Sequence, residues 1–308
     1  MTVSIGKDQR IHFFDAMIEP VVHIEPGTKL SLQTTNSIIE RMLKHPGTSD
    51  EDLMSDPDVW RPVPPEEGNP ATGPIYVNGA SEGDALAVEI HSIDPVGTGF
   101  SVICSGALNG RTERLVRFFD SEQEDVFFAP GIIIPKRPMV GVIGTAPKEG
   151  RVATQSLGDH GGNMDASVVT AGATVYLPVF VPGALLSVGD VHTAMGDGEI
   201  NGMGIETQAK VDIEVDVVPG MPLKRPMVET SSNWITIASH EELEKAIWLA
   251  VEDMTDFLAR YLDMPIGEAL LLVSLAADVR ICQVVNRLRA ARVELPKTVL
   301  PSQIKILL

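Results

Sequence analysis

The segment from Asp190 to Glu206, DVHTAMGDGEINGMGIE, combines acidic side chains, a histidine and several glycines. Its ionisable residues are Asp190, His192, Asp197, Glu199 and Glu206. Two apolar runs precede it, at Val175–Val181 and Ala184–Gly189, and both are typical of buried strands. Charged groups at the ends of buried strands must be paired, metal-bound or neutralised, so we predict a functional site here.

The spacing of these residues indicates which side chains share a face. Side chains two residues apart on a strand point the same way, so we expect Asp190 and His192 on one side, and likewise Asp197 with Glu199. The glycines between them allow tight turns and a close approach of the backbone to a ligand or a neighbouring strand.

A second polar segment, GDHGGNMD, spans Gly158 to Asp165 and brings His160, Asn163 and Asp165 into a glycine-rich loop. Two histidines with several carboxylates are a plausible ligand set for a divalent metal, and the imidazoles favour Zn²⁺. Such a metal activates water and polarises a carbonyl, as amide hydrolysis requires. A carboxylate that does not bind the metal can act as general base, and Asn163 can stabilise the oxyanion.

Each of these residues also has a purely structural interpretation. A single acid in a glycine-rich segment is usually a turn residue, and a single histidine is more often hydrogen-bonded than metal-bound. Together they favour a site, because a turn needs only one acid.

The motifs resemble those of the acetamidase/formamidase family. The resemblance rests on GDHGGNMD together with ATVYLPVFVPGALLSVGDVHTAMGDGE at Ala173–Glu199. It extends to EPGTKL at Glu25–Leu30, TGPIYVNGASEGDALAVEI at Thr72–Ile90, VGVIGTAP at Val140–Pro147 and LLLVSLAADVRICQVV at Leu270–Val285.

The resemblance implies a metal-linked hydrolase of short, neutral amides such as formamide or acetamide, with a β-rich, oligomeric structure. We predict four residues as metal ligands and four in catalysis. The predicted ligands are His160, His192, Asp190 and Asn36. The predicted catalytic residues are Glu199, Asp197, Asn163 and Asp165. The motifs do not decide which acid is the general base.

The chain departs from the family pattern at two places. Relatives often have an acid where this chain has Asn36, and a lysine where it has Ala166 and Ser167. An asparagine can still coordinate a metal through its carbonyl oxygen, but more weakly than a carboxylate. These departures leave a second hypothesis open, in which a non-catalytic, β-rich family member binds a ligand and a structural cation. A serine or cysteine nucleophile is a third, although Ser156, Ser167 and Ser187 lie in no elbow motif.

The composition of the chain limits the classes of partner that it could bind. The chain has 308 residues, 44% of them hydrophobic, with 27 glycines, 22 prolines and a formal net charge of −18. That charge argues against nucleic acid or an anionic membrane as partner. Two distant cysteines do not suggest a disulfide scaffold, and no stretch has the length and apolarity of a membrane span, so we predict a cytoplasmic protein. The acidic run at Ser49–Asp58 makes a second site, for Ca²⁺, conceivable, although it lacks EF-hand spacing.

The pattern of elements predicts an α+β, mainly β fold with packed, sandwich-like β layers and C-terminal helices. We divide the chain into a β-rich half (1–98), connecting strands (99–151), a central β-rich half with the site motifs (152–222) and a helical part (223–308). A short helix is expected from Asn36 to Leu43, ended by His45-Pro46-Gly47. In the helical part, a capping box at Ser239 and Glu242 should begin one helix, and a second should run from Glu268 to Val285, with a possible break near Ala276.

Overall fold

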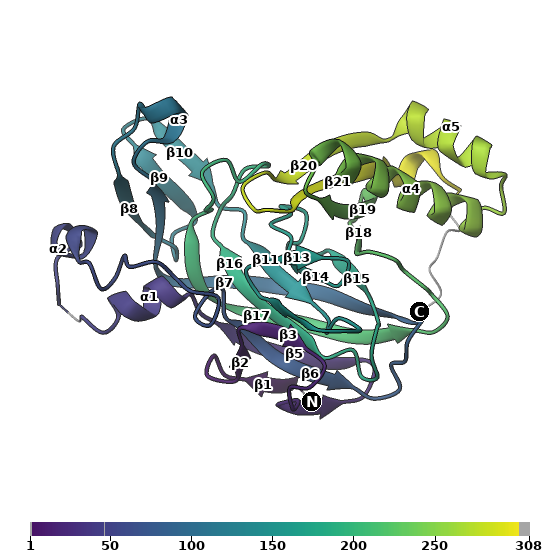
Figure 1. Ribbon diagram of the computed structural model, residues 1–308, viewed down its shortest axis with the longest axis horizontal. Coiled ribbons are helices and arrows are strands. Elements are labelled where there is room, and N and C mark those ends of the chain that lie inside the picture. The colour runs from purple at the N-terminus through teal and green to yellow at the C-terminus, as the bar shows by residue number, and fades with distance from the viewer. Residues whose placement is uncertain (1, 46, 302–308) are drawn as a thin grey trace.

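The computed structural model describes residues 2–45 and 47–301, and within these ranges one large, curled sheet of 17 strands dominates (Figure 1). Its strands are β1 (Thr2–Ile5), β2 (Arg10–Ile11), β4 (Val22–Ile24), β5 (Thr28–Thr34), β6 (Ala71–Val77), β7 (Ala85–Ile103), β8 (Leu115–Asp120), β11 (Met139–Gly144), β13 (Leu157–Gly158), β14 (Gly161–Asn163), β15 (Thr174–Pro178), β16 (Leu186–His192), β17 (Glu206–Val218), β18 (Met227–Glu229), β19 (Asn233–His240), β20 (Asp278–Gln283) and β21 (Arg289–Pro296). The prediction of a mainly β, α+β fold with C-terminal helices is confirmed.

The remaining elements are smaller. Two short antiparallel sheets pair β3 (Phe13–Asp15) with β12 (Arg151–Ala153), and β9 (Asp125–Ala129) with β10 (Ile132–Pro135). The helices are α1 (Ser37–Met42), α2 (Asp50–Ser55), α3 (Ala107–Gly110), α4 (Leu243–Tyr261) and α5 (Ile266–Ala276), followed by a 3₁₀ turn at Lys297–Val299.

Strand β17 lies at the centre of the core, between β5 and β7, and is antiparallel to both. Its residues alternate in burial: Val211, Ile213 and Val215 are buried, while the residues between them are partly exposed. Val211 is opposite Leu32 of β5, and Leu32 also faces β1. The apolar side of β17 thus joins the first and middle parts of the chain in one core.

Strand β16 is buried along its whole length, as its apolar sequence predicts. It pairs antiparallel with β11 on one side and β6 on the other. Asp190 and His192 lie in its last three residues, and the chain returns through a loop to Glu206, the first residue of β17. The acidic segment therefore lies at the end of a strand held from both sides.

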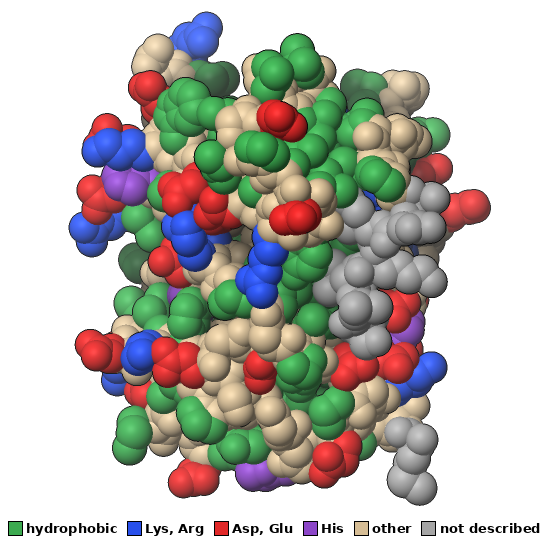
Figure 2. Space-filling view, turned by 90° about the vertical axis from the view of Figure 1, so that its right-hand side faces the viewer, with side chains coloured by type: hydrophobic (Ala, Val, Ile, Leu, Met, Phe, Trp, Pro, Cys, Tyr) green, Lys and Arg blue, Asp and Glu red, His purple; other side chains and the backbone are tan. Residues whose placement is uncertain are grey.

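The C-terminal helices α4 and α5 pack beside the sheet formed by β18 to β21 (Figure 1). Trp234 of β19 stacks near Phe257 of α4, with ring centroids 5.1 Å apart. Hydrophobic side chains gather on the outer face of this part (Figure 2), and Trp248, Leu271 and Leu275 are exposed there. Such exposed apolar residues agree with an oligomer, which stays a prediction.

The expected capping box at Ser239 is wrong. Ser239 and His240 belong to β19, where they are opposite Ala290 and Arg289 of β21. Their backbone is thus held in an extended conformation, and α4 begins only at Leu243, with no side-chain hydrogen bond at its N-cap. Pairing with a neighbouring strand overrides the local helix signal.

The second predicted helix is shorter than its longest expected extent. It ends at Ala276, the position of the possible break, and Ala277 is extended. Asp278 to Gln283 then form β20, which pairs with β21. Alternation of polar residues with Val279 and Ile281 suits a strand, because β-branched side chains pack well on a pleated surface.

The short helix expected after Asn36 is confirmed as α1, with Asn36 as its N-cap. Leu43 is the C-cap, while Pro46, expected to end the helix, lies outside the described residues. Ser49 caps α2, so the acidic run begins a helix.

Strands from all four predicted segments of the chain join the same sheet, so the four-part division stays a prediction. Among residues 2–45 and 47–301, none of the helices is both long and apolar enough to cross a membrane.

We expect Leu32→Ala to lower the free energy of unfolding by about 2–5 kcal/mol, because it leaves a cavity between β1, β5 and β17. Leu275→Ala, at an exposed position on α5, should change that free energy by less than about 0.5 kcal/mol. Urea denaturation measures both. Equal effects of the two substitutions would contradict the position of Leu32 in the core.

Candidate functional site

Five ionisable side chains are buried together where β16 ends and β17 begins. Their exposed fractions are Asp165 0%, Asp190 4%, His192 1%, Glu199 6% and Glu206 5%. They form two groups, Asp165–His192–Glu199 and Asp190–His192–Glu206, in each of which the potential ligand atoms lie within 4.8 Å of one another. His192 belongs to both groups and is therefore the centre of the cluster.

Strand pairing sets the position of the second group. His192 is opposite Glu206 where β16 pairs with β17. Its Nε2 lies 3.1 Å from Oε1 of Glu206 and 3.8 Å from Oδ2 of Asp190. The prediction that Asp190 and His192 share one side is therefore confirmed.

Two glycines allow the charged groups to lie this close to the backbone. A Cβ at Gly204 would lie 2.7 Å from Cγ of His192, so the imidazole packs directly on this glycine. A Cβ at Gly141, in β11, would lie 2.5 Å from Oδ1 of Asp165. Any other residue at either position would displace a side chain of the cluster.

The backbone is strained at four residues of the site. Asn69, Asp165, Asp190 and Glu199 have left-handed φ values of 32°, 44°, 52° and 45°. For a residue with a Cβ this conformation costs about 1–3 kcal/mol and persists only where the surrounding structure enforces it. Strained residues of this kind cluster at functional sites, and these four agree with the assignment of a site here, although Ala184 and Leu185 have left-handed φ values outside it.

Burial dominates the electrostatics of the cluster. It raises the pKa of Glu199 to about 10, and the nearby Asp165 carboxylate adds to this effect. Burial also raises the pKa of Asp165 to about 6, although His192 opposes the rise. Burial and Glu206 raise the pKa of Asp190 well above its usual range. Burial would lower the pKa of His192, but the carboxylates of Glu206 and Asp190 outweigh it and raise this pKa.

The cluster also contains unpaired polar atoms. Among the described residues, both carboxylate oxygens of Asp165, Nδ1 of His192 and Oε2 of Glu199 are buried without a hydrogen-bond partner. Unpaired buried polar atoms are rare and call for a missing partner. Four carboxylates around one imidazole carry an excess of negative charge, so a divalent cation fits this set of donors.

A cavity of about 220 Å³ opens onto the cluster. Asp190, Glu199 and Glu206 contribute to its wall. Amide side chains and apolar side chains form most of the rest, together with Ser37 and Gly202. The amide residues are Asn36, Asn69, Gln155, Asn163 and Asn286, and the apolar ones are Ile38, Val63, Met203 and Val285. A small polar molecule with a short apolar substituent would match this wall.

The fold and sequence are shared with proteins of known structure. A predicted acetamidase/formamidase from Thermoanaerobacter tengcongensis is 37% identical, and the match covers 97% of each chain with a TM-score of 0.87. An acetamidase from Bacillus halodurans is 35% identical over 96% of this chain and 98% of that one, with a TM-score of 0.84. Residues 151–286 match the model of the Acetamidase/Formamidase family. The chain belongs to this family.

Curated members of the acetamidase/formamidase family match over a shorter range. The acetamidase of Mycolicibacterium smegmatis is 28% identical over the aligned region, and the match covers 48% of this chain and 53% of that protein. A putative formamidase of Schizosaccharomyces pombe is also 28% identical, over 51% of this chain and 54% of its own. This chain thus matches only about half the length of these relatives.

Asn36, the position at which this family member departs from the expected acid, lies beside the cluster with its amide nitrogen toward it. Nδ2 donates to Oε2 of Glu206 at 3.0 Å. Oδ1 accepts the backbone N–H of Ile38 at 2.9 Å, as the N-cap of α1. In this arrangement Asn36 is a hydrogen-bond donor to a carboxylate, and its assignment as a metal ligand stays a prediction.

His160 lies apart from both groups. Its ring packs edge-on against Phe14, with the centroids 4.9 Å apart. Burial lowers the pKa of His160 to about 4, which keeps the ring neutral. Only one imidazole belongs to the two groups of potential ligand atoms, although Nε2 of His160 is also buried without a hydrogen-bond partner among the described residues. The assignments of His160 as a ligand and of Zn²⁺ as the metal stay predictions.

Asp197 is also separate from the cluster, although the even spacing placed it beside Glu199. The chain between them turns at Gly198, so the two side chains diverge. Partial burial would raise the pKa of the Asp197 carboxyl, but the hydrogen bonds from Arg292 and Ser167 and the charge of Arg292 together outweigh burial and lower this pKa. Asn163, in contrast, lines the cavity as expected of a residue near the substrate.

No motif in the sequence identified Asn69 as a residue of the site. Its Nδ2 donates to Oδ2 of Asp190 at 2.7 Å and lies 3.5 Å from Oδ1 of Asn163. Asn69 lies in the loop rich in proline and glycine before β6, and such ordered loops often line sites on a rigid scaffold. Glu206 lies in the acidic segment of the sequence, but its position there does not distinguish a site residue from an ordinary strand residue.

The acidic run at Ser49–Asp58 forms no comparable cluster. Among the described residues, this run contributes to none of the groups of three potential ligand atoms. Asp56 accepts the backbone N–H of Asp58 at 2.8 Å, as a turn residue does. A third group, Glu89–His91–Glu214, lies at the surface, where Nζ of Lys29 is 3.5 Å from Glu214.

We expect Gly204→Ala to lower the free energy of unfolding by about 1–3 kcal/mol, because the new methyl group would overlap the ring of His192. Gly196→Ala is a matched control in the same loop, since a Cβ there has no neighbour within 4 Å. Urea denaturation of both variants measures the difference. If Gly204→Ala were as stable as Gly196→Ala, the packing of His192 on Gly204 would be contradicted.

Proposed function

We propose that this chain hydrolyses short aliphatic amides, of the formamide or acetamide type, to a carboxylate and ammonia. The proposal rests on two groups of buried potential ligands that share His192. Asp190, Glu199 and Glu206 of these groups line a small cavity. Family membership supports it, because the relatives from M. smegmatis and Methylophilus methylotrophus are named acetamidase and formamidase.

In this proposal, Asp190, His192 and Glu206 hold a divalent metal. Their potential ligand atoms already converge, and Asn69 and Asn36 orient two of the carboxylates by donating to them. Such outer hydrogen bonds fix ligands in their binding orientation. The metal, when bound, lowers the pKa of a water molecule and polarises the carbonyl of the substrate.

Glu199 is the proposed general base. Its Oε2 is buried and, among the described residues, has no hydrogen-bond partner, while the residue also lines the cavity. Burial keeps this carboxyl protonated at neutral pH when no cation is present, and a bound cation would favour its ionised form. The ionised Oε2 takes a proton from water as the water oxygen bonds to the carbonyl carbon. When the C–N bond breaks, Glu199 returns this proton to the leaving nitrogen, which departs as ammonia. The Asp165 carboxylate lies beside that of Glu199 and adds negative charge next to it.

The amide side chains of the cavity are proposed to bind the substrate's own amide group. Asn163, whose Nδ2 donates to the backbone oxygen of Gln155 at 3.3 Å, is held with its head group in the wall. It can donate its second N–H to the carbonyl oxygen as negative charge develops there. Ile38 and Val63 give the short acyl chain an apolar surface.

Replacement of Glu199 by glutamine should lower kcat for ammonia release at least about 100-fold, because the amide cannot accept the proton from water. Glu242→Gln, at an exposed position, is the control and should keep wild-type activity. Ammonia release from formamide, acetamide and propionamide is the assay. Activity of Glu199→Gln within about tenfold of wild type, roughly 1.4 kcal/mol of barrier, would contradict the role of Glu199.

Removal of metal by a chelator should suppress ammonia release, and adding back one of Zn²⁺, Mn²⁺, Mg²⁺ or Ca²⁺ should restore it. His192→Ala should lose both bound metal and activity, whereas His91→Ala, which disrupts only the surface group, should keep both. Elemental analysis of the same samples gives the metal content. Full activity of a metal-free protein would contradict the proposed role of the metal. Bound metal without release from any of the three amides would favour the non-catalytic alternative.

A further inference from the structure

Glu199 lies in the middle of the loop that connects β16 to β17, here called the site loop (residues 193–205). Its side chain is buried, although Asp197 and Ile200 on either side are exposed. Its φ of 45° is unfavourable for a residue with a Cβ. An exposed loop would not keep such a conformation by itself, so contacts from elsewhere must hold it.

Those contacts come from the C-terminal hairpin (residues 278–296), which comprises β20, a turn and β21. The backbone N–H of Gly198 donates to the carbonyl of Cys282 at 2.9 Å, and the N–H of Val284 donates to the carbonyl of Gly198 at 3.1 Å. Gly198 immediately precedes Glu199. The hairpin thus fixes the peptide next to the proposed general base.

An ion pair reinforces this backbone contact. Arg292 of β21 donates from Nη1 to Oδ1 of Asp197 at 3.0 Å and from Nη2 to Oδ2 at 2.6 Å. The side chain of Arg292 is 3% exposed and that of Asp197 is 35% exposed. A two-pronged pair between a guanidinium and a carboxylate fixes direction as well as distance. Burial of Arg292 also limits screening by water.

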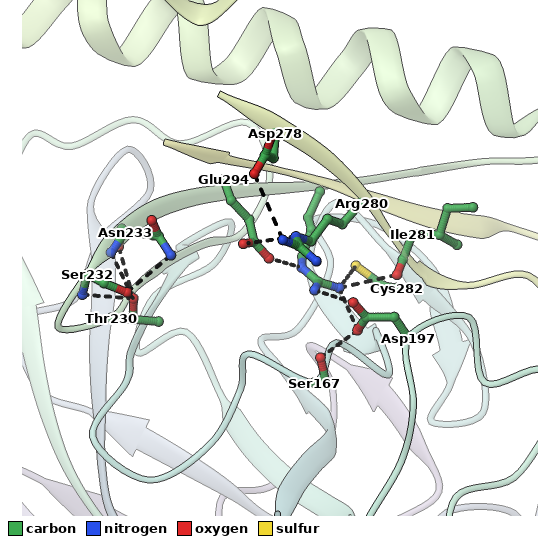
Figure 3. A network of polar contacts seen from close by, with 11 residues as sticks. Ser167, Asp197, Thr230, Ser232, Asn233, Asp278, Arg280, Ile281, Cys282 and Glu294 are labelled. Atoms are coloured by element: carbon green, nitrogen blue, oxygen red, sulfur yellow. Dashed lines mark hydrogen bonds and ion pairs between the residues drawn. The ribbon is translucent and has the colours of Figure 1, made fainter. Parts of the chain in front are cut away.

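The pair belongs to a larger network (Figure 3). Figure 3 shows Asp197 between Ser167 on one side and the hairpin residues Cys282 and Glu294 on the other. Ser167 donates to Oδ1 of Asp197 at 2.6 Å, and Nε of Arg292 donates to Glu294 at 2.6 Å. Asp197 is therefore held from two directions, and Arg292 is itself oriented by a neighbour on its own strand.

The turn of the same hairpin forms part of the cavity wall. Oε1 of the buried Gln283 accepts the backbone N–H groups of Val285 and Asn286 at 2.9 and 3.0 Å. Both Val285 and Asn286 line the cavity. The hairpin thus contributes to the site directly, through its turn, and indirectly, through the site loop.

We propose that Arg292 and Asp197 are a positioning pair, which fastens the site loop to the C-terminal hairpin and so holds Glu199 toward Asp165 and His192. Asp197 would then act through the loop and not as a catalytic residue. The catalytic consequence rests on the proposed function, whereas the effect on the loop does not.

The test uses Asp197→Asn, Arg292→Met and Arg292→Lys in the full chain. Asp253→Asn is the matched control, because Arg225 and Asp253 form another buried, two-pronged pair, with distances of 2.6 and 2.8 Å. Asp253 belongs to α4 and does not line the cavity. Four measurements are made on each variant: amide hydrogen exchange, Zn²⁺ affinity, kcat and KM for ammonia release, and the midpoint of urea unfolding.

We expect the amides of residues 198 and 199 to exchange faster in Asp197→Asn and Arg292→Met than in wild type. kcat should fall about 10- to 100-fold, as for outer residues that orient a site, with KM nearly unchanged. Zn²⁺ affinity should stay near the wild-type value, because the proposed ligands Asp190, His192 and Glu206 lie outside the site loop. Arg292→Lys keeps the charge and should lose less than Arg292→Met. Asp253→Asn should lower the unfolding midpoint without altering exchange at residues 198 and 199, affinity or kcat.

Wild-type exchange at residues 198 and 199 in Asp197→Asn would overturn the proposal, whatever the activity. An equal loss of kcat in Asp253→Asn would also overturn it, because the effect would then be one of general stability. If wild type released no ammonia, the proposed function would fail, while faster exchange in Asp197→Asn would still support the positioning pair.

Discussion

The burial of four carboxylates around a single imidazole is the constraint to which the rest of the site responds. Removing charge from water costs several kcal/mol per ion unless a partner compensates it. His192 compensates only part of this charge, and burial therefore raises the pKa values of Asp190 and Glu199. A cation relieves the same excess charge without protonating the ligands. The arrangement thus lowers the stability of the protein when no ion is bound and raises its affinity for a positive ion.

The sheet provides the rigidity that such a site requires. β16 is paired on both sides, so the positions of Asp190 and His192 are set by ladders of backbone hydrogen bonds and not by their own side chains. The left-handed φ values at Asp165 and Glu199 add strain that these ladders must offset. Both loops that carry these residues, 164–173 and 193–205, are bounded by strands at each end, which makes that possible.

Much of this site could be predicted from the sequence, because its central residues follow a buried strand. The period of two along β16 correctly placed Asp190 beside His192. The same rule failed for Asp197, because it assumes an extended chain and the backbone turns at Gly198. His160 shows a different limit, since no local pattern reveals that its ring packs on Phe14. Likewise, helix signals near Ser239 could not reveal the strand partner that overrides them. Contacts between distant segments decided each of these cases.

The dispersed origin of the site has a consequence for how the protein folds. The cavity wall draws on residues from Asn36 to Asn286, and none of the contributing segments is complete without the others. A topology dominated by such distant pairings has a high contact order, and chains of this kind fold slowly because loop closure precedes any stabilising contact. The ligand set should therefore assemble late, after the sheet has closed. Any ion that binds it would act on the last step of folding, by slowing the reopening of a finished structure.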